Sequence, residues 1–86
     1  MIDEAEIKSK NLLIGLGKAM RELRKQKNMT QNQLANRAGL SQPVLCRIER
    51  GGFYSLKLLC LVAEALDVEI EVNFLKKSPA NSKQQV

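Results

Sequence analysis

The sequence predicts a small all-α protein, a bundle of four helices, with one β-strand near its C-terminus that pairs across a dimer. Two observations indicate this fold. Apolar residues recur every three to four positions over most of the chain, and strict apolar–polar alternation follows at residues 68–74. The chain has 86 residues, of which 44% are hydrophobic and 27% charged, so we expect one folded domain. We place it at residues 10–75, between an N-terminal extension (1–9) and a flexible tail (76–86).

The first helix is predicted at about residues 10–26. Its apolar residues lie at helical spacing and are Leu12, Leu13, Leu16, Met20 and Leu23. Gly15 and Gly17 lie on the same segment, but no strand precedes them and no further glycine completes a phosphate-binding pattern. We therefore interpret both glycines as small residues that allow close helix packing.

The second helix is predicted to begin after Thr30 and to end at Gly39. Thr30 and Gln33 have the spacing of a capping box, in which each side chain accepts a hydrogen bond from the other residue's backbone N–H. Gly39 can adopt the positive φ that ends a helix, and Leu40 is apolar enough to lie beneath the turn.

The third helix is predicted to begin at Ser41 as N-cap and to end at Gly51. Pro43 falls in its first turn, where the missing N–H has no intrahelical partner. Leu45 and Ile48, about one turn apart, are expected to point inward. The residues expected to point outward are Gln42, Pro43, Cys46, Arg47 and Arg50.

The fourth helix is predicted from Ser55 to about Leu66, and its sequence is apolar on all sides. The stripe expected to face inward is Leu56, Leu59, Cys60, Ala63 and Leu66. The second stripe is Leu58, Leu61, Val62 and Ala65. Because a helix that is apolar all round is covered all round, we expect the second stripe to meet its copy in a homodimer.

The alternating segment at residues 68–74 is predicted to be a β-strand. A single strand cannot satisfy its own backbone groups, and the sequence predicts no second strand. We therefore expect it to pair with the same strand of another protomer or with a partner protein; the alternative is an irregular extension of the fourth helix. The apolar residues expected at this dimer contact are Val68, Ile70, Val72 and Phe74.

The segment TQNQLANRAGLSQPVLCRIERG, followed by SLKLLCLVAEALDV, resembles the helix-turn-helix of the Cro/CI-type, or XRE-like, DNA-binding proteins. The resemblance covers about residues 16–68 and implies a lambda-repressor-like bundle. The link Gly52–Tyr54 is shorter and more aromatic than is usual in that family. The fourth helix and the predicted strand together resemble the dimerisation element of HipB-like antitoxins.

This resemblance implies that the third helix enters the major groove of double-stranded DNA. Gln42 can then pair with adenine N6 and N7, and Arg47 with guanine O6 and N7. By the same resemblance, Thr30 and Gln31 at the start of the second helix bind phosphate. The predicted DNA-binding residues are Thr30, Gln31, Ser41, Gln42, Pro43, Val44, Cys46, Arg47 and Arg50.

Glu49 lies near the end of the DNA-binding helix, where an unpaired carboxylate would repel phosphate. In the resembling family an arginine on the first helix pairs with a glutamate at this position, and Arg24 and Glu49 occupy the matching places. We predict a partly buried ion pair that braces the first helix against the third. The alternative is two unrelated surface charges.

Charge supports nucleic acid as the partner. Residues 18–57 contain nine Lys or Arg and two Glu, a net charge of +7, whereas the remaining residues sum to −2. Cys46 and Cys60 lack metal-ligand spacing and the chain has no His, so we expect reduced thiols, no metal and no cofactor. No signal peptide and no apolar run of about 18 residues is present, so we expect no membrane contact and a cytoplasmic location.

The sequence therefore predicts a sequence-specific transcriptional regulator, a dimeric repressor of its own operon that binds a palindromic operator. The alternative is an antitoxin that represses its operon and sequesters a cognate toxin protein. A scaffold that keeps the fold but has lost DNA binding is a further alternative. An enzyme is not expected, because there is no His and no nucleophile beside a candidate base.

Overall fold

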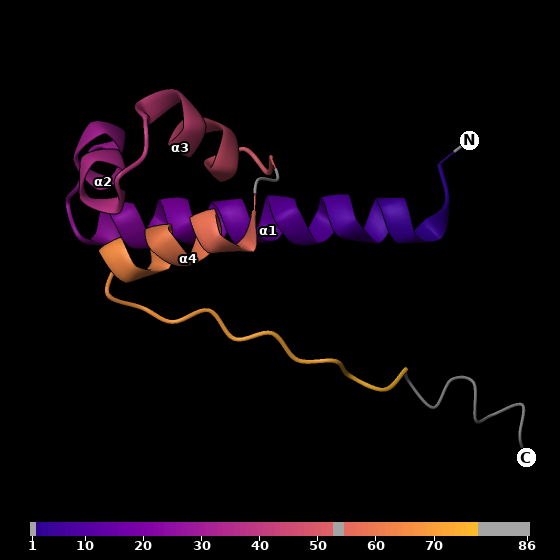
Figure 1. Ribbon diagram of the computed structural model, residues 1–86. Coiled ribbons are helices and arrows are strands. Elements are labelled where there is room, and N and C mark those ends of the chain that lie inside the picture. The colour runs from indigo at the N-terminus through magenta and orange to yellow at the C-terminus, as the bar shows by residue number, and fades with distance from the viewer. Residues whose placement is uncertain (1, 53–54, 78–86) are drawn as a thin grey trace, which may run out of the picture.

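The computed structural model describes residues 2–52 and 55–77, and these residues contain four α-helices and no β-strand. The helices are α1 (Glu4–Gln26), α2 (Gln31–Ala38), α3 (Gln42–Glu49) and α4 (Leu56–Ala65). The three short helices gather around the C-terminal half of α1, and its N-terminal half projects beyond them (Figure 1). Within the described part of the chain, no helix has the length and hydropathy needed to cross a membrane.

Each helix begins at a side chain that accepts a backbone hydrogen bond. The N-caps are Asp3, Thr30, Ser41 and Ser55. At Thr30 the capping box is complete, since Gln33 N donates to Thr30 Oγ1 at 3.1 Å and Thr30 N donates to Gln33 Oε1 at 2.9 Å. The predicted starts of α2, α3 and α4 are thus confirmed.

Each helix also ends in the same way, with a residue at positive φ. These residues are Asn28 (57°), Gly39 (76°), Gly51 (96°) and Asp67 (64°). In every case the residue that follows the positive-φ residue donates its backbone N–H to the carbonyl five positions before itself. Leu40 N, for example, donates to Ala35 O at 2.8 Å. Gly39 and Gly51 end their helices as predicted. Asn and Asp serve at the other two ends because they tolerate this conformation better than other non-glycine residues.

The first helix begins earlier than predicted, at Glu4 instead of about residue 10. The Asp3 side chain accepts a hydrogen bond from Glu6 N at 2.8 Å, and the carboxylates of Glu4 and Glu6 lie at the positive end of the helix dipole. Lys8 lies 3.6 Å from Glu4 one turn later. Most of the predicted N-terminal extension is therefore helical. The predicted tail lies outside the described residues from 78 onward.

The core lies between α2, α3, α4 and the second half of α1. Its largest fully buried side chains are Leu34, Leu45, Ile48, Val62 and Leu66. Leu45 and Ile48 point inward as predicted. On α1, Met20 is buried, whereas Leu12 is 74% exposed because it lies on the projecting half. The predicted apolar face of α1 thus packs only where the other helices cover it.

The two glycines of α1 have different surroundings. A Cβ at Gly17 would lie 2.5 Å from Ile48 O and 2.7 Å from Glu49 O, so Gly17 lets α1 approach the end of α3. A Cβ at Gly15 would meet nothing within 4 Å. The packing interpretation is therefore confirmed for Gly17 and wrong for Gly15.

The faces predicted for α4 are wrong in part. Val62 and Ala65, assigned to a dimer interface, are buried within the chain's own core at 0% and 9% exposure. Cys60 and Leu56, assigned to the inward stripe, are exposed. The residues of α4 that face the core are Leu59, Val62, Ala63 and Leu66, which recur three or four positions apart as expected for one face of a helix. Of the second stripe, Leu58 and Leu61 are only partly buried.

The predicted β-strand that pairs across a dimer is also wrong. Residues 68–77 contain no strand. Val68 N donates to Ala63 O as part of the end of α4, and Val68 and Ile70 pack against the core. They line a hollow with Leu16 and Met20 of α1. The alternation in this stretch thus arises because one side of an extended segment lies on the protein's own helices, while Val72 and Phe74 are exposed.

Candidate nucleic-acid interface

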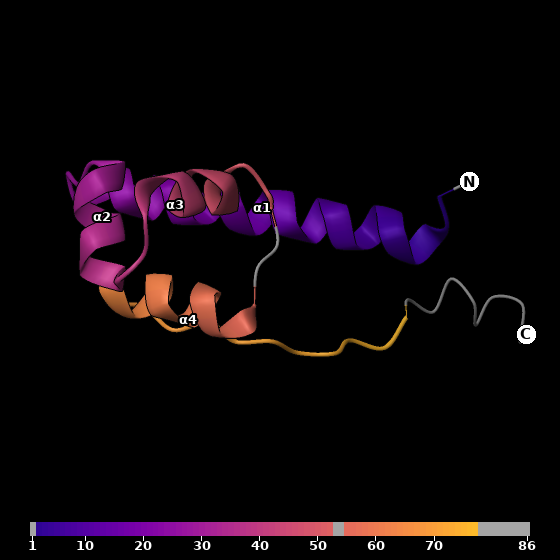
Figure 2. The same ribbon diagram turned by 45° about the horizontal axis from the view of Figure 1, so that its top comes forward.

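Helices α2 and α3 form a helix-turn-helix. They are joined by the turn at Gly39–Ser41, and Leu40 within it is partly buried against the core. Figures 1 and 2 show α3 on the side of the bundle away from α4, where its outer face is uncovered. The close approach at Gly17 anchors the C-terminal end of α3 to α1.

The predicted DNA-binding residues differ in exposure. Those that are exposed are Thr30, Ser41, Pro43, Arg47 and Arg50. Those that are partly buried are Gln31, Gln42, Val44 and Cys46. Val44 packs against the core. The main charged side chains that the α3 surface offers to a partner are therefore those of Arg47 and Arg50. The link Gly52–Tyr54 lies in part outside the described residues.

The ion pair between Arg24 and Glu49 is present and buried. Arg24 Nε donates to Glu49 Oε2 at 2.7 Å and Arg24 Nη2 to Glu49 Oε1 at 3.0 Å. The residues are 8% and 7% exposed. Arg24 Nη1 also donates to Met29 O at 2.8 Å, so one guanidinium joins α1, the following turn and α3. The alternative of two unrelated surface charges is excluded.

Two glutamines extend this pair toward the start of α3. Gln31 Nε2 donates to Glu49 Oε1 at 3.0 Å, and Gln42 Nε2 donates to Gln31 Oε1 at 2.7 Å. Sequence reasoning assigned Gln31 to phosphate and Gln42 to a base, and it missed the bond between them. No local signal could have revealed this bond or the bond from Gln31 to Glu49, because the bonded residues are 11 and 18 positions apart, respectively.

Arg21 is a basic residue of this surface that sequence reasoning also missed. A hollow of about 310 Å³ between α1 and α3 is lined by Arg21, Arg24, Gln31, Cys46, Glu49 and Arg50. Because Glu49 is already paired with Arg24, the exposed guanidiniums of Arg21 and Arg50 leave the mouth of this hollow positive. Lys18 and Lys25 continue the basic surface along α1 beside Arg21. The local charge excess was visible in the sequence, but its placement beside α3 was not.

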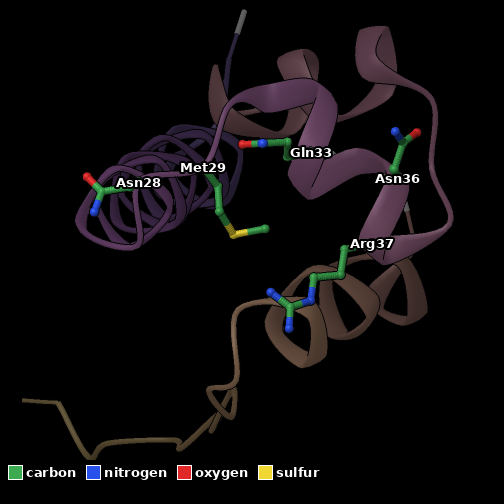
Figure 3. Close-up of a pocket in the computed structure, with 5 residues that line it drawn as sticks. All are labelled: Asn28, Met29, Gln33, Asn36 and Arg37. Atoms are coloured by element: carbon green, nitrogen blue, oxygen red, sulfur yellow. The ribbon is translucent and has the colours of Figure 1, made fainter.

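A second, more open hollow lies on the turn after α1 and on α2 (Figure 3). It is lined by Asn28, Met29, Gln33, Asn36 and Arg37. Asn28 and Asn36 lie at opposite ends of it in Figure 3. These side chains include no nucleophile and no carboxylate, so the hollow offers no evident chemistry. Within the described ranges, no group of three His, Cys, Asp or Glu is placed to hold a metal ion.

Comparison with protein families agrees with this geometry. Residues 20–73 match a family model described as Helix-turn-helix (HTH_3). The chain belongs to this helix-turn-helix family. The match covers α2, α3, α4 and the end of α1. The protein is accordingly a DNA-binding transcription regulator of the XRE type.

Two solved structures are similar to this one. The restriction-modification controller protein C.AhdI from Aeromonas hydrophila is 38% identical, with a TM-score of 0.63 over 66% of this chain and 84% of that chain. The clp gene regulator ClgR from C. glutamicum is 35% identical, with a TM-score of 0.66 over 69% of this chain and 77% of that chain. No curated protein matches significantly. The resemblance to HipB-like antitoxins gains no support, since the strand it relied on is not formed at residues 68–77.

Proposed function

We propose that this helix-turn-helix protein is a transcriptional repressor that binds a palindromic operator as a homodimer and controls its own operon. The observation that supports it best is the uncovered face of α3, which carries Arg47 and Arg50 and continues into Arg21 on α1. A helix of this size fits the major groove of B-form DNA. The two similar structures are a controller protein and a gene regulator, which favours a role at promoters.

Arg47 is the residue we assign to base recognition. It is exposed on α3, and its guanidinium can donate two hydrogen bonds to guanine O6 and N7. Each such pair contributes about 1–3 kcal/mol of discrimination against the wrong base. Arg21 and Arg50, at the mouth of the basic hollow, are assigned to phosphate, as is the N-terminus of α2 at Thr30.

A homodimer would double this small contact surface. Two α3 helices about 34 Å apart would enter successive major grooves and so require a two-fold symmetric site. Leu58 and Leu61 remain the part of α4 assigned to the dimer contact, because both are only partly buried in the chain. An operator that overlaps a promoter would then be covered by the bound dimer, which is repression by occlusion.

Selection of bound sites from random double-stranded DNA tests this proposal. We expect an enriched palindrome, a two-protomer complex by sedimentation, and an affinity that falls steeply with salt as phosphates release counterions. Arg47→Ala should relax the preference at one base pair per half-site, whereas Arg21→Ala should weaken all sites alike and lower the salt slope by roughly 0.9 per phosphate contact. Absence of any enriched sequence, or binding as a single protomer, would contradict the proposal.

A further inference from the structure

An apolar hollow of about 230 Å³ lies between α1, the end of α4 and the segment that follows α4. None of its lining residues belongs to α3 or to the basic hollow beside α3. A partner that filled it would therefore leave the proposed DNA-binding surface uncovered. The apolar side chains that line it include Leu16, Ala19, Leu23, Leu66, Val68 and Ile70.

The same segment then presents three apolar side chains to solvent. Val72, Phe74 and Leu75 are 69%, 101% and 87% exposed. Val68 and Ile70, only a few residues earlier, pack against the core. Contiguous exposed apolar side chains mark a site of interaction. We call residues 72–75 the apolar segment.

The apolar segment does not reach the hollow of its own protomer. Phe74 is four residues beyond Ile70, which lines the hollow, and four extended residues span about 13 Å. Residues 70–75 contain neither Gly nor Pro to reverse the chain, and Figures 1 and 2 show them running away from the bundle. The exposed phenyl ring is therefore presented to another molecule.

The hollow and the apolar segment fit each other in size. An apolar cavity of about 150 Å³ can hold a benzene ring, so a hollow of about 230 Å³ has room for one phenylalanine side chain. Small-molecule sites are typically larger, at roughly 300–1,000 Å³.

The charges beside the two surfaces are also complementary. Glu69 and Glu71 line the hollow, and we call these two residues its acidic rim. Lys76 and Lys77 directly follow the apolar segment and are exposed. An apolar seat with an acidic rim thus matches an apolar segment that ends in two lysines, and both occur in every copy of the chain.

We propose that Phe74 of one protomer inserts into the apolar hollow of a second copy, while Lys76 and Lys77 lie against the acidic rim of that copy. A two-fold axis makes the exchange reciprocal, so each dimer contains two such contacts. The contact is made by side chains and involves no β-ladder, in agreement with the absence of a strand at residues 68–77. This inference rests on the proposed function, since it names a contact of the homodimer proposed there.

The first experiment measures the dimer dissociation constant of the full chain without DNA by sedimentation equilibrium. Phe74→Ala should raise it on the order of a hundredfold, because a buried aromatic anchor is lost twice per dimer. Ala19→Lys should also raise it, since Ala19 is an exposed α1 residue that lines the hollow and lysine suits a helix. The matched control is Ile7→Ala, which removes an exposed apolar side chain of α1 outside the hollow and should change nothing.

A charge exchange tests the pairing itself. One variant carries Lys76→Glu and Lys77→Glu, and the other carries Glu69→Lys and Glu71→Lys. Each variant alone opposes like charges at both contacts and should dimerise more weakly than the wild type. In an equimolar mixture, both contacts of the heterodimer regain opposite charges. We therefore expect the mixture to form a heterodimer, detected by native mass spectrometry.

The outcomes separate this inference from the proposed function. If Phe74→Ala dimerises as tightly as the wild type, or if the two charge variants do not pair with each other, the inferred contact is wrong. The proposed function then stands, with its dimer held elsewhere, as at Leu58 and Leu61. If the wild type stays a single protomer both in solution and on its selected DNA, the inference and the proposed function fail together.

Discussion

The two halves of α1 have the same secondary structure and very different surroundings. From Gly17 to Gln26 the helix carries Met20 and Arg24, both buried against the other helices. From Glu4 to Leu12 it projects from the bundle, and Leu12 is 74% exposed (Figure 1). Similar spacing of apolar residues thus led to packing in one half only. Substitutions in the two halves should therefore change the free energy of unfolding by different amounts, and even in opposite directions.

The largest expected effect is at the buried ion pair of the packed half. Arg24→Leu should lower the free energy of unfolding by about 3–5 kcal/mol, because it leaves the Glu49 carboxylate buried without its partner. Urea denaturation measures this change. The double variant Arg24→Leu/Glu49→Leu should recover much of the loss, since two apolar groups need no partner. A loss near that of an exposed pair, below about 1 kcal/mol, would show that the pair does not brace the bundle.

Gly17→Ala should have the next largest effect. Its Cβ would lie 2.5 Å from Ile48 O, and because this atom belongs to the backbone of α3, the two helices must move apart. We expect a destabilisation of about 1–3 kcal/mol and weaker binding to operator DNA, since α3 is displaced. Thermal unfolding and a DNA titration give the two values. A variant with unchanged stability would mean that α1 and α3 lie farther apart.

Gly15→Ala should act in the opposite direction, and it serves as the matched control for Gly17→Ala. Nothing lies within 4 Å of the added Cβ, so only the gain in helix propensity remains. We expect a stabilisation of about 0.5–1 kcal/mol with DNA affinity unchanged. A loss of stability at this position would imply that another surface covers the projecting half of α1.

Leu12→Gln should have the smallest effect. The side chain is 74% exposed, and Leu and Gln have similar helix propensities, so the free energy of unfolding should change by less than about 0.5 kcal/mol. Comparison of the melting temperature at low and high protein concentration extends the test. If Leu12→Gln lowered the melting temperature by an amount that depends on protein concentration, Leu12 would lie in a contact between protomers.

Much of this fold could be predicted because its signals are local. N-caps at Thr30, Ser41 and Ser55 and the glycines at 39 and 51 act within five residues of the helix ends that they define. Asp3 and the acidic first turn of α1 were visible in the sequence, yet the helix was predicted to start about six residues late, at about residue 10. Amphipathic spacing also assigned Leu45 and Ile48 to the core.

The rest depended on which surfaces meet. Apolar spacing alone could not assign the faces of α4, because nearly every position is apolar, and packing selected Leu59, Val62 and Leu66. Alternation at 68–74 suggested a strand, yet burial of Val68 and Ile70 on the protein's own helices produces the same pattern.

The candidate site divides in the same way. The DNA-binding residues expected on α3, and the pairing of Arg24 with Glu49, could be inferred because the sequence resembles a known helix-turn-helix family. The bonds through Gln31 to Gln42 and the place of Arg21 beside α3 could not, because they join residues brought together from three helices. Hydrogen bonds between distant side chains depend on angstrom-scale packing, and no short-range pattern in a sequence encodes it.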